Sequence, residues 1–167
     1  MKTLLNIFLA TLFLFYPNNE EMVSLKCMVE MTDYRGQGAY FTISVVDNKE
    51  SYLKTVYVLG TDKTWFSEMK SFWKHLKINN LFLDDEFYPI IEGISGPTIS
   101  GGETRILLLK IPKSLYNKNN RLRFETAVED KGYYTDDVNI ALNNDGMNKV
   151  YDGTGFINNI KFILPLK

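Results

Sequence analysis

The residues best suited to chemistry lie near the middle of the chain, where small side chains predominate between Ile91 and Gly102. Within this segment Thr98 follows Gly96 and Pro97, and more glycines come soon after it. Glycine lets a bulky partner approach the backbone, and a threonine hydroxyl beside it can accept a covalent group. The segment is therefore the main candidate for a modification site.

The same segment also has a purely structural explanation. Glycine, proline and serine are typical of tight turns, and the segment stands directly before the apolar run from Ile106 to Ile111. A long connection between a helix and a strand would use such residues without any chemistry. Both explanations remain open at the level of the sequence.

The rest of the chain offers few catalytic groups. His75 is its single histidine, which excludes sites that need two imidazoles, such as a typical catalytic zinc centre. No Gly-x-Ser-x-Gly motif supports a serine nucleophile. Cys27 alternates with apolar residues, and burial on an apolar strand face would raise the pKa of its thiol. We therefore predict a protein that is not an enzyme and has no metal centre.

Three acidic or amide-rich clusters have oxygen ligands that suit calcium. They are Asp84–Glu86, Asp136–Asp137 and Asn143–Gly146. The last cluster is not an EF-hand loop, because Ala141 stands where an aspartate is required. Solvated turns are the simpler explanation, and a loose calcium site between loops is the alternative.

Several tyrosines stand in turn-like surroundings. Tyr133 and Tyr134 lie between Gly132 and Thr135, and Tyr88 precedes a proline. Exposed aromatic rings in loops can bind sugars, peptides or a planar ring system. Packing in the interior is the alternative explanation for these rings.

The charge balance excludes two classes of partner. The formal net charge is −1, so the chain presents no basic surface to nucleic acid or to an anionic lipid bilayer. We expect neither partner.

The first residues predict export. Lys2 precedes an apolar block, Leu4–Phe15, which at about twelve residues is shorter than the roughly 20 that a membrane span needs. We interpret residues 1–22 as a signal peptide and residues 23–167 as a single extracytoplasmic domain with no membrane span after signal removal. An uncleaved anchor is the alternative, because Tyr16–Glu20 lacks a small-x-small cleavage pattern.

Beyond the signal, apolar and polar residues alternate with the period of two that is typical of strands. The predicted strands cover residues 23–31, 40–45, 52–59, 105–111, 121–129, 138–142 and 156–164. We expect the first three to form a meander. Turn-forming clusters separate most of the strands from one another.

One segment changes to the helical period. From Thr61 onward, Phe66, Phe72 and Leu76 fall on one broad face, and Asp62 or Thr64 can cap the helix. Short strands with one interrupting helix predict a mainly β fold, an immunoglobulin-like antiparallel β-sandwich with one inserted amphipathic helix.

Four runs of residues, taken in order, resemble a known family. They are Tyr34–Asp47, Leu53–Gly60, Trp65 with Phe72–Lys74, and Ser95–Thr98. The chain resembles the predicted periplasmic proteins of the domain-of-unknown-function 2271 family over most of residues 25 to 130. The resemblance implies a periplasmic accessory or binding module. It also implies a protein partner in the cell envelope, such as a flavin transferase or a membrane redox protein.

The segment around Thr98 also resembles the acceptor motif for covalent FMN, Asp-x-x-Ser/Thr-Gly-Ala-Thr/Ser. By position, Glu92 takes the acidic place, and Ser95 and Gly96 take the following pair. Thr98 takes the place of the hydroxyl that is esterified to the flavin phosphate, while Pro97 replaces the alanine. The resemblance implies an alternative function, an electron-transfer protein whose flavin does one- and two-electron chemistry.

Overall fold

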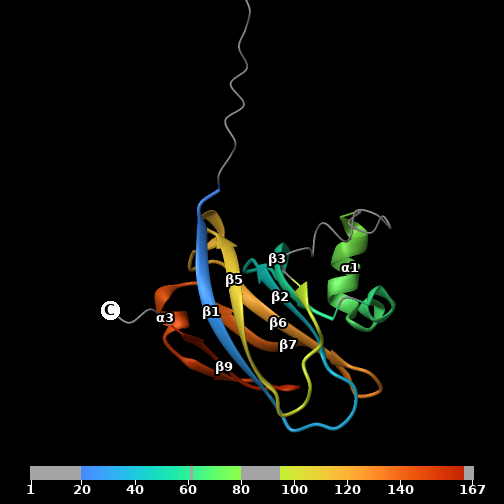
Figure 1. Cartoon of the computed structure of the whole chain (residues 1–167). Coiled ribbons are helices and arrows are strands. Elements are labelled where there is room, and N and C mark those ends of the chain that lie inside the picture. The colour runs from blue at the N-terminus through green and yellow to red at the C-terminus, as the bar shows by residue number, and fades with distance from the viewer. Residues whose placement is uncertain (1–19, 61, 80–94, 164–167) are drawn as a thin grey trace, which may run out of the picture.

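Alternating burial along the chain produces two sheets that pack face to face (Figure 1). The computed structural model describes residues 20–60, 62–79 and 95–163. Within these residues one sheet has four strands and the other has five. The prediction of a mainly β sandwich is confirmed.

The four-stranded sheet is antiparallel throughout. Its order is β5 (Thr104–Pro112), β1 (Met22–Met31), β9 (Ile157–Ile163) and β8 (Val150–Asp152). The five-stranded sheet has the order β4 (Ser95–Gly96), β3 (Tyr52–Leu59), β2 (Tyr40–Val46), β6 (Arg121–Val128) and β7 (Gly132–Ala141). The short β4 runs parallel to β3, and the other pairs are antiparallel.

The inner faces of the two sheets form the main core. Cys27 and Val29 of β1 are fully buried there together with Phe41, Ile43 and Phe124 of the opposite sheet. The predicted inward face of β1 is therefore confirmed, and Cys27 is a buried free thiol whose pKa is raised by burial. Such a thiol packs as a small apolar side chain and is a poor nucleophile.

The predicted meander is wrong. β1 pairs with β5 and β9 in one sheet, whereas β2 pairs with β3 and β6 in the other. The connection from Thr32 to Ala39 therefore crosses between the sheets. The period of two reveals which side chains face inward, but it does not say which strand lies alongside.

A helical segment covers the outer face of the five-stranded sheet. It consists of a 3₁₀ helix, η1 (Lys63–Glu68), and a helix, α1 (Lys70–Ile78), which Figure 1 shows beside β2 and β3. This segment and the sheet bury a second, smaller apolar cluster: Val58, Phe66, Met69, Phe72, Leu76 and Ala127. The prediction of one continuous helix is wrong, because Met69 has a non-helical ψ of 71° and α1 begins after it without a side-chain cap.

Two further short helices lie in the connections, η2 (Lys113–Leu115) and α3 (Asn144–Met147). The side chain of Asn143 accepts a hydrogen bond from the backbone N–H of Gly146 at 2.8 Å and so caps α3. This bond gives the Asn143–Gly146 cluster a structural role.

The predicted signal peptide lies mostly outside the described residues. Within them, Met22 is already the first residue of β1, and the carbonyl of Glu21 accepts a hydrogen bond from the N–H of Lys113. The folded part therefore begins slightly before the boundary we predicted. Of the helices in residues 20–60, 62–79 and 95–163, none is long and apolar enough to cross a bilayer.

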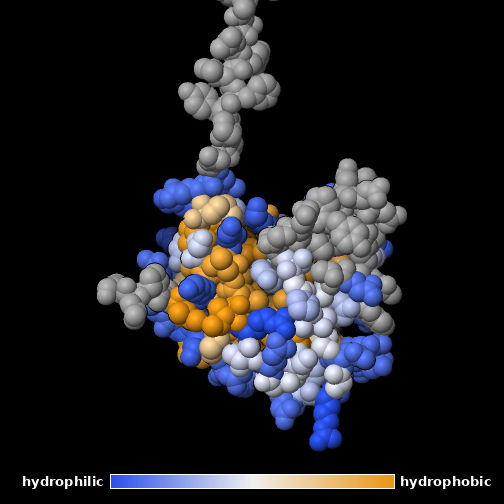
Figure 2. Space-filling model, viewed as in Figure 1, coloured by the Kyte–Doolittle hydropathy of each residue, from blue (hydrophilic) through white to orange (hydrophobic). Residues whose placement is uncertain are grey.

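The outer face of the four-stranded sheet is rich in exposed apolar side chains. Ile106 and Leu108 of β5 are 59% and 52% exposed. Met22, Val150 and Ile163 of neighbouring strands are exposed as well, and Figure 2 shows a continuous apolar area on this side of the molecule. Lys26 and Lys161 interrupt the face, because both are exposed on it.

Candidate functional site

A cavity of about 610 Å³ opens between α1 and the five-stranded sheet. The residues that line it come from the turn before β3, from β3 itself, from α1 and from β6. They are Glu50, Ser51, Tyr52, Ser71, Lys74, His75, Ile78, Asn79 and Arg123. The cavity exists because α1 packs on the sheet through its apolar residues and leaves a polar region of the same sheet face beside it.

Strand β6 supplies the charged floor of this region. Its alternation sends Leu122 and Phe124 into the main core and Arg123 and Glu125 to the opposite face. Both charged side chains are nonetheless buried, Arg123 being 4% and Glu125 0% exposed. Charges this deeply buried require partners.

Strand β2 adds two hydroxyls to the same face. Thr42 lies opposite Glu125 in the β2–β6 register, and Ser44 lies opposite Arg123. Both hydroxyls are fully buried and have no hydrogen-bond partner among the described residues. Buried polar atoms without partners are rare in folded proteins. The sheet face beneath α1 therefore has hydrogen-bonding groups that its own contacts leave unused.

Tyr52 forms the wall between the cavity and this polar region. Its ring stacks on His75 of α1, with ring centroids 4.5 Å apart and an interplanar angle of 20°. The guanidinium of Arg123 lies against the ring as well, 4.4 Å from its centroid. Stacking of one aromatic ring on another is favourable, and so is the contact of a cation with the face of a ring. These contacts fix the ring at the edge of the cavity.

Two tyrosines hold the carboxylate of Glu125. The hydroxyl of Tyr52 donates a hydrogen bond to Oε1 at 2.5 Å, and that of Tyr133 donates one to Oε2. Burial raises the pKa of Glu125 to about 6, although these hydrogen bonds and Arg123 favour the ionised form. Burial, followed by the nearby carboxylate, raises the pKa of Tyr133 to about 12 and also raises that of Tyr52. Both tyrosines therefore remain donors at neutral pH.

Arg123 is only partly satisfied by its neighbours. Its Nη1 lies 3.0 Å from Oε2 of Glu50 and 4.0 Å from Oδ1 of Asp136. Its Nε is 3.6 Å from Oε1 of Glu125, beyond hydrogen-bonding distance, and has no hydrogen-bond partner. A buried guanidinium that lines a cavity is suited to bind a ligand acceptor atom.

His75 and Lys74 complete the cavity from the side of α1. Burial lowers the pKa of His75, and the positive charge of Arg123 lowers it further, so the imidazole is neutral at neutral pH. The side-chain amide of Asn79 lies 3.1 Å from Nδ1 of His75 and also donates to the His75 carbonyl. Lys74, which also lines the cavity, is exposed. The cavity thus offers cationic and neutral hydrogen-bonding groups.

The sequence-predicted segment lies elsewhere, at the other end of β3. Ser95 pairs with Val58, and Gly96, which follows it in β4, accepts a hydrogen bond from the N–H of Gly60 at 2.8 Å. Tyr52 is the first residue of β3, and the far end of that strand is roughly 23 Å away at about 3.3 Å per residue. The cavity and the segment are therefore separate regions.

Thr98 is partly buried between two glycines. A Cβ at Gly38 would lie 2.5 Å from Oγ1 of Thr98, and one at Gly60 would lie 3.0 Å from its Cγ2. Arg105 donates hydrogen bonds to the carbonyls of Pro97 and Thr98. The hydroxyl of Thr98 therefore packs against the backbone of Gly38, and this close approach explains why glycine stands there. Glu92, the remaining predicted site residue, lies outside the described residues.

The turn-like interpretation of the tyrosine pair is wrong. Tyr133 and Tyr134 both lie inside β7, which begins at Gly132. Tyr133 binds Glu125 as described above, and the ring of Tyr134 packs edge-on against Phe156 at 5.3 Å. Tyr88 lies outside the described residues.

Asp137 has a structural role that the sequence did not reveal. It is buried, and its carboxylate accepts hydrogen bonds from the backbone N–H groups of four consecutive residues, Thr154 to Ile157. It also accepts one from the hydroxyl of Thr126 at 2.5 Å. The carboxylate therefore anchors the turn before β9. In the described part of the chain no cluster of three His, Cys, Asp or Glu side chains is placed to hold a metal ion.

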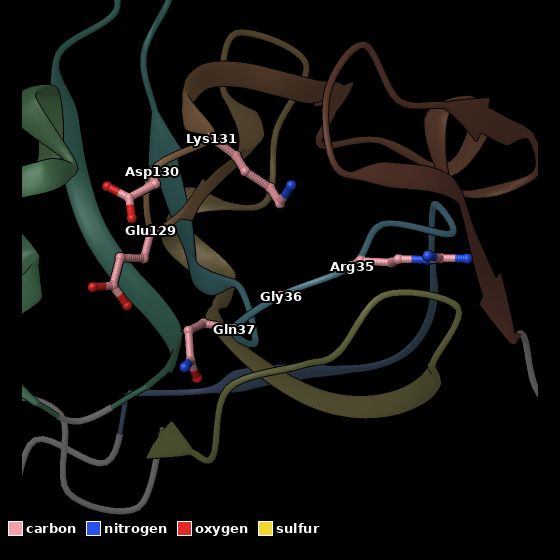
Figure 3. Close-up of a pocket in the computed structure, with 6 residues that line it drawn as sticks. All are labelled: Arg35, Gly36, Gln37, Glu129, Asp130 and Lys131. Atoms are coloured by element: carbon pink, nitrogen blue, oxygen red, sulfur yellow. The ribbon is translucent and has the colours of Figure 1, made fainter.

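A second, shallower pocket of about 390 Å³ lies between two turns (Figure 3). Arg35, Gly36 and Gln37 form one side, and the residues from Glu129 to Lys131 form the other. Figure 3 shows that Arg35 extends away from Glu129 and Asp130, so the charged groups do not converge on a common point. The cavity beside α1 is the better candidate site.

The comparisons with known proteins identify a family but give no more specific function. A family model described as "Predicted periplasmic protein (DUF2271)" matches residues 22–159. The chain belongs to this family. The match to the domain-of-unknown-function 2271 family thus includes strands of both sheets and the helical segment, and the family's description agrees with the extracytoplasmic location expected from the sequence. No curated protein and no solved structure matches the chain.

Proposed function

We propose that this member of the domain-of-unknown-function 2271 family is an extracytoplasmic, non-catalytic binding module whose ligand site is the cavity beside α1. The observation that carries the proposal is Arg123, a buried guanidinium that lines an open cavity and whose Nη1 is paired there with the partly exposed carboxylate of Glu50. Ligand sites combine a concave shape with a few oriented polar groups, and this region has both.

The chemistry of the cavity favours binding over catalysis. The imidazole of His75 is held flat against Tyr52, and its pKa is lowered by burial and by Arg123. Among the described residues that line the cavity, no hydroxyl or carboxylate is hydrogen-bonded to His75, whose Nδ1 lies beside the side-chain amide of Asn79 instead. Hydrogen-bond donors held in fixed positions around the cavity are suited to the recognition of a small molecule.

A ligand titration followed by NMR tests this proposal. Phosphate, succinate, succinamide and glucose would be added in turn to the ¹⁵N-labelled mature chain. We expect at least one of them to cause saturable shifts of the backbone amides of Ser51, Ser71 and Asn79. Shifts confined to the second pocket, at Gly36 and Lys131, would contradict the placement of the site.

The wider role we propose is that of an accessory protein in a flavin-linked redox system of the cell envelope. The proposal rests on the family resemblance, which implies a protein partner such as a flavin transferase or a membrane redox protein. Cross-linking in intact cells, followed by identification of the captured proteins by mass, tests it. Capture of envelope proteins without any redox component would count against this role.

Covalent FMN at Thr98 is the second candidate function. Its support is positional, because Ser95, Gly96 and Thr98 lie together at an edge of the sheet. The hydroxyl of Thr98 packs against Gly38, so this segment would have to open before a transferase could reach that hydroxyl. Co-expression with an FMN transferase, followed by intact mass measurement, is the test. A flavin mass increment that Thr98→Ala removes and Ser100→Ala retains would establish the carrier function.

A further inference from the structure

The groups around the cavity are mainly cationic. Of the residues that line it, Arg123 and Lys74 carry positive charge, and Glu50 is the one carboxylate. Asp136 and Glu125 also face Arg123, but they lie outside the cavity lining. Among the described residues, Glu50 is therefore the one carboxylate that both lines the cavity and pairs with the buried guanidinium of Arg123.

Glu50 is positioned so that its side chain can move away from Arg123. It lies in the turn between β2 and β3 with a left-handed φ of 65°, and its side chain is 48% exposed. The turn is held by Asp47, whose Oδ1 accepts hydrogen bonds from the N–H groups of Lys49 and Ser51. Among the described residues, the carboxylate of Glu50 itself is bound only to Arg121 and Arg123. Its side chain can therefore swing toward solvent while the turn keeps its shape.

An incoming anion would preserve the charge balance of the buried arginine. When Glu50 leaves, Nη1 of Arg123 loses its 3.0 Å partner, and the remaining carboxylates lie 3.6 Å from Nε and 4.0 Å from Nη1, so a buried charged donor loses its hydrogen bond, which is costly. A carboxylate or phosphate can take that place on Nη1, since such groups form strong charge-assisted hydrogen bonds with a guanidinium. A neutral ligand offers no replacement for the lost charge.

We propose that the cavity binds a small molecule through an anionic group, a carboxylate or a phosphate, which replaces the carboxylate of Glu50 on Arg123 while Lys74 closes over the outer side. This inference rests on the proposed function, because it assigns a ligand class to the same cavity. Glu50 then acts as an internal competitor that occupies Nη1 of Arg123 when the site is empty.

The test is isothermal titration calorimetry of the mature chain with sodium phosphate, sodium succinate and the uncharged succinamide, at constant ionic strength. Glu50→Gln removes the competitor, and we expect affinity for phosphate or succinate to rise by about three- to tenfold, as the loss of a competing ion pair implies. Glu21→Gln is the matched control, because it removes an exposed partner of Lys113 with the same change in net charge. The control should leave the affinity unchanged.

A second pair of variants keeps the test independent of the buried network. Lys74→Gln lies on the exposed side of α1 and should weaken anion binding several-fold, whereas Lys70→Gln, on the same helix but outside the cavity lining, should not. Equal effects of Glu50→Gln and Glu21→Gln would overturn the exchange with Glu50. Binding of succinamide alone would overturn the anionic class and leave the proposed function standing, whereas no binding of any of the three would count against both.

Discussion

Replacing Glu125 by glutamine should change how the stability of the protein depends on pH. Burial raises the pKa of Glu125 from 4.5 to about 6 in the folded state. Between these two values the folded chain holds a proton that the unfolded chain has released, so stability falls as pH rises through this window. At about 1.36 kcal/mol for each pKa unit, the loss is about 2 kcal/mol above pH 6.

Glutamine at this position removes the titration and leaves an amide of similar shape. Its oxygen can accept from one of the two tyrosines, and its NH₂ group can donate to the other hydroxyl. We therefore expect the unfolding free energy of Glu125→Gln to rise relative to that of the wild type by about 2 kcal/mol as the pH goes from 4.5 to 6.5. This change is independent of the difference between the two proteins at pH 4.

Urea unfolding of both proteins at several pH values measures this difference. Glu30, Asp47 and Glu103 have lowered pKa values and add their own pH dependence, but they do so equally in both proteins and cancel in the comparison. Glu68→Gln, at an exposed position, is the control for removing a carboxylate. A difference between wild type and Glu125→Gln that stays constant from pH 4 to pH 7 would refute the reasoning.

Four further substitutions test the fold, each read from chemical unfolding. Leu109→Ala should cost about 2–5 kcal/mol because the side chain is fully buried, whereas Leu108→Lys, at a 52% exposed position next to it, should change stability by less than about 0.5 kcal/mol. Asp137→Asn should cost about 3 kcal/mol, since one amide oxygen cannot accept all the backbone N–H groups that the carboxylate serves. Gly101→Ala should cost about 2 kcal/mol or more, because its Cβ would lie 2.0 Å from the carbonyl oxygen of Tyr34.

The strands could be predicted because burial on one face of a strand leaves a period of two in the sequence. β1 is a clear example, with Leu25, Cys27 and Val29 buried and the residues between them more exposed. Which strands pair could not be predicted in the same way. The pairing of β1 with β5 and β9 depends on contacts between distant segments, and no local pattern records those contacts.

The cavity was missed because its polar residues follow the ordinary alternation of a half-exposed strand. In β6, Arg123 and Glu125 alternate with Leu122 and Phe124, which predicts charged side chains in solvent. Both are buried because the helical segment covers the other side of the sheet. A usable signal was present in the broad apolar face of that segment, since such a face must pack against something.

Tyr133 was misplaced for a related reason. Gly132 suggested a turn around the tyrosines that follow it, but it is the first residue of β7 and has a φ of 119°. The strand therefore begins immediately after the turn, and the register with β6 places Tyr133 opposite Ala127. From there its hydroxyl reaches the carboxylate of Glu125.

The most direct test of the account is the ¹⁵N-resolved NMR signal of the Arg123 Nε–H while phosphate or succinate is added to the mature chain. We predict a saturable shift of this signal, together with no shift of the Arg105 Nε–H, which is already hydrogen-bonded to Glu103 at 2.9 Å. A signal for Arg123 that stays in place while anions bind elsewhere on the protein would contradict the claim that the Arg123 guanidinium forms part of a ligand site.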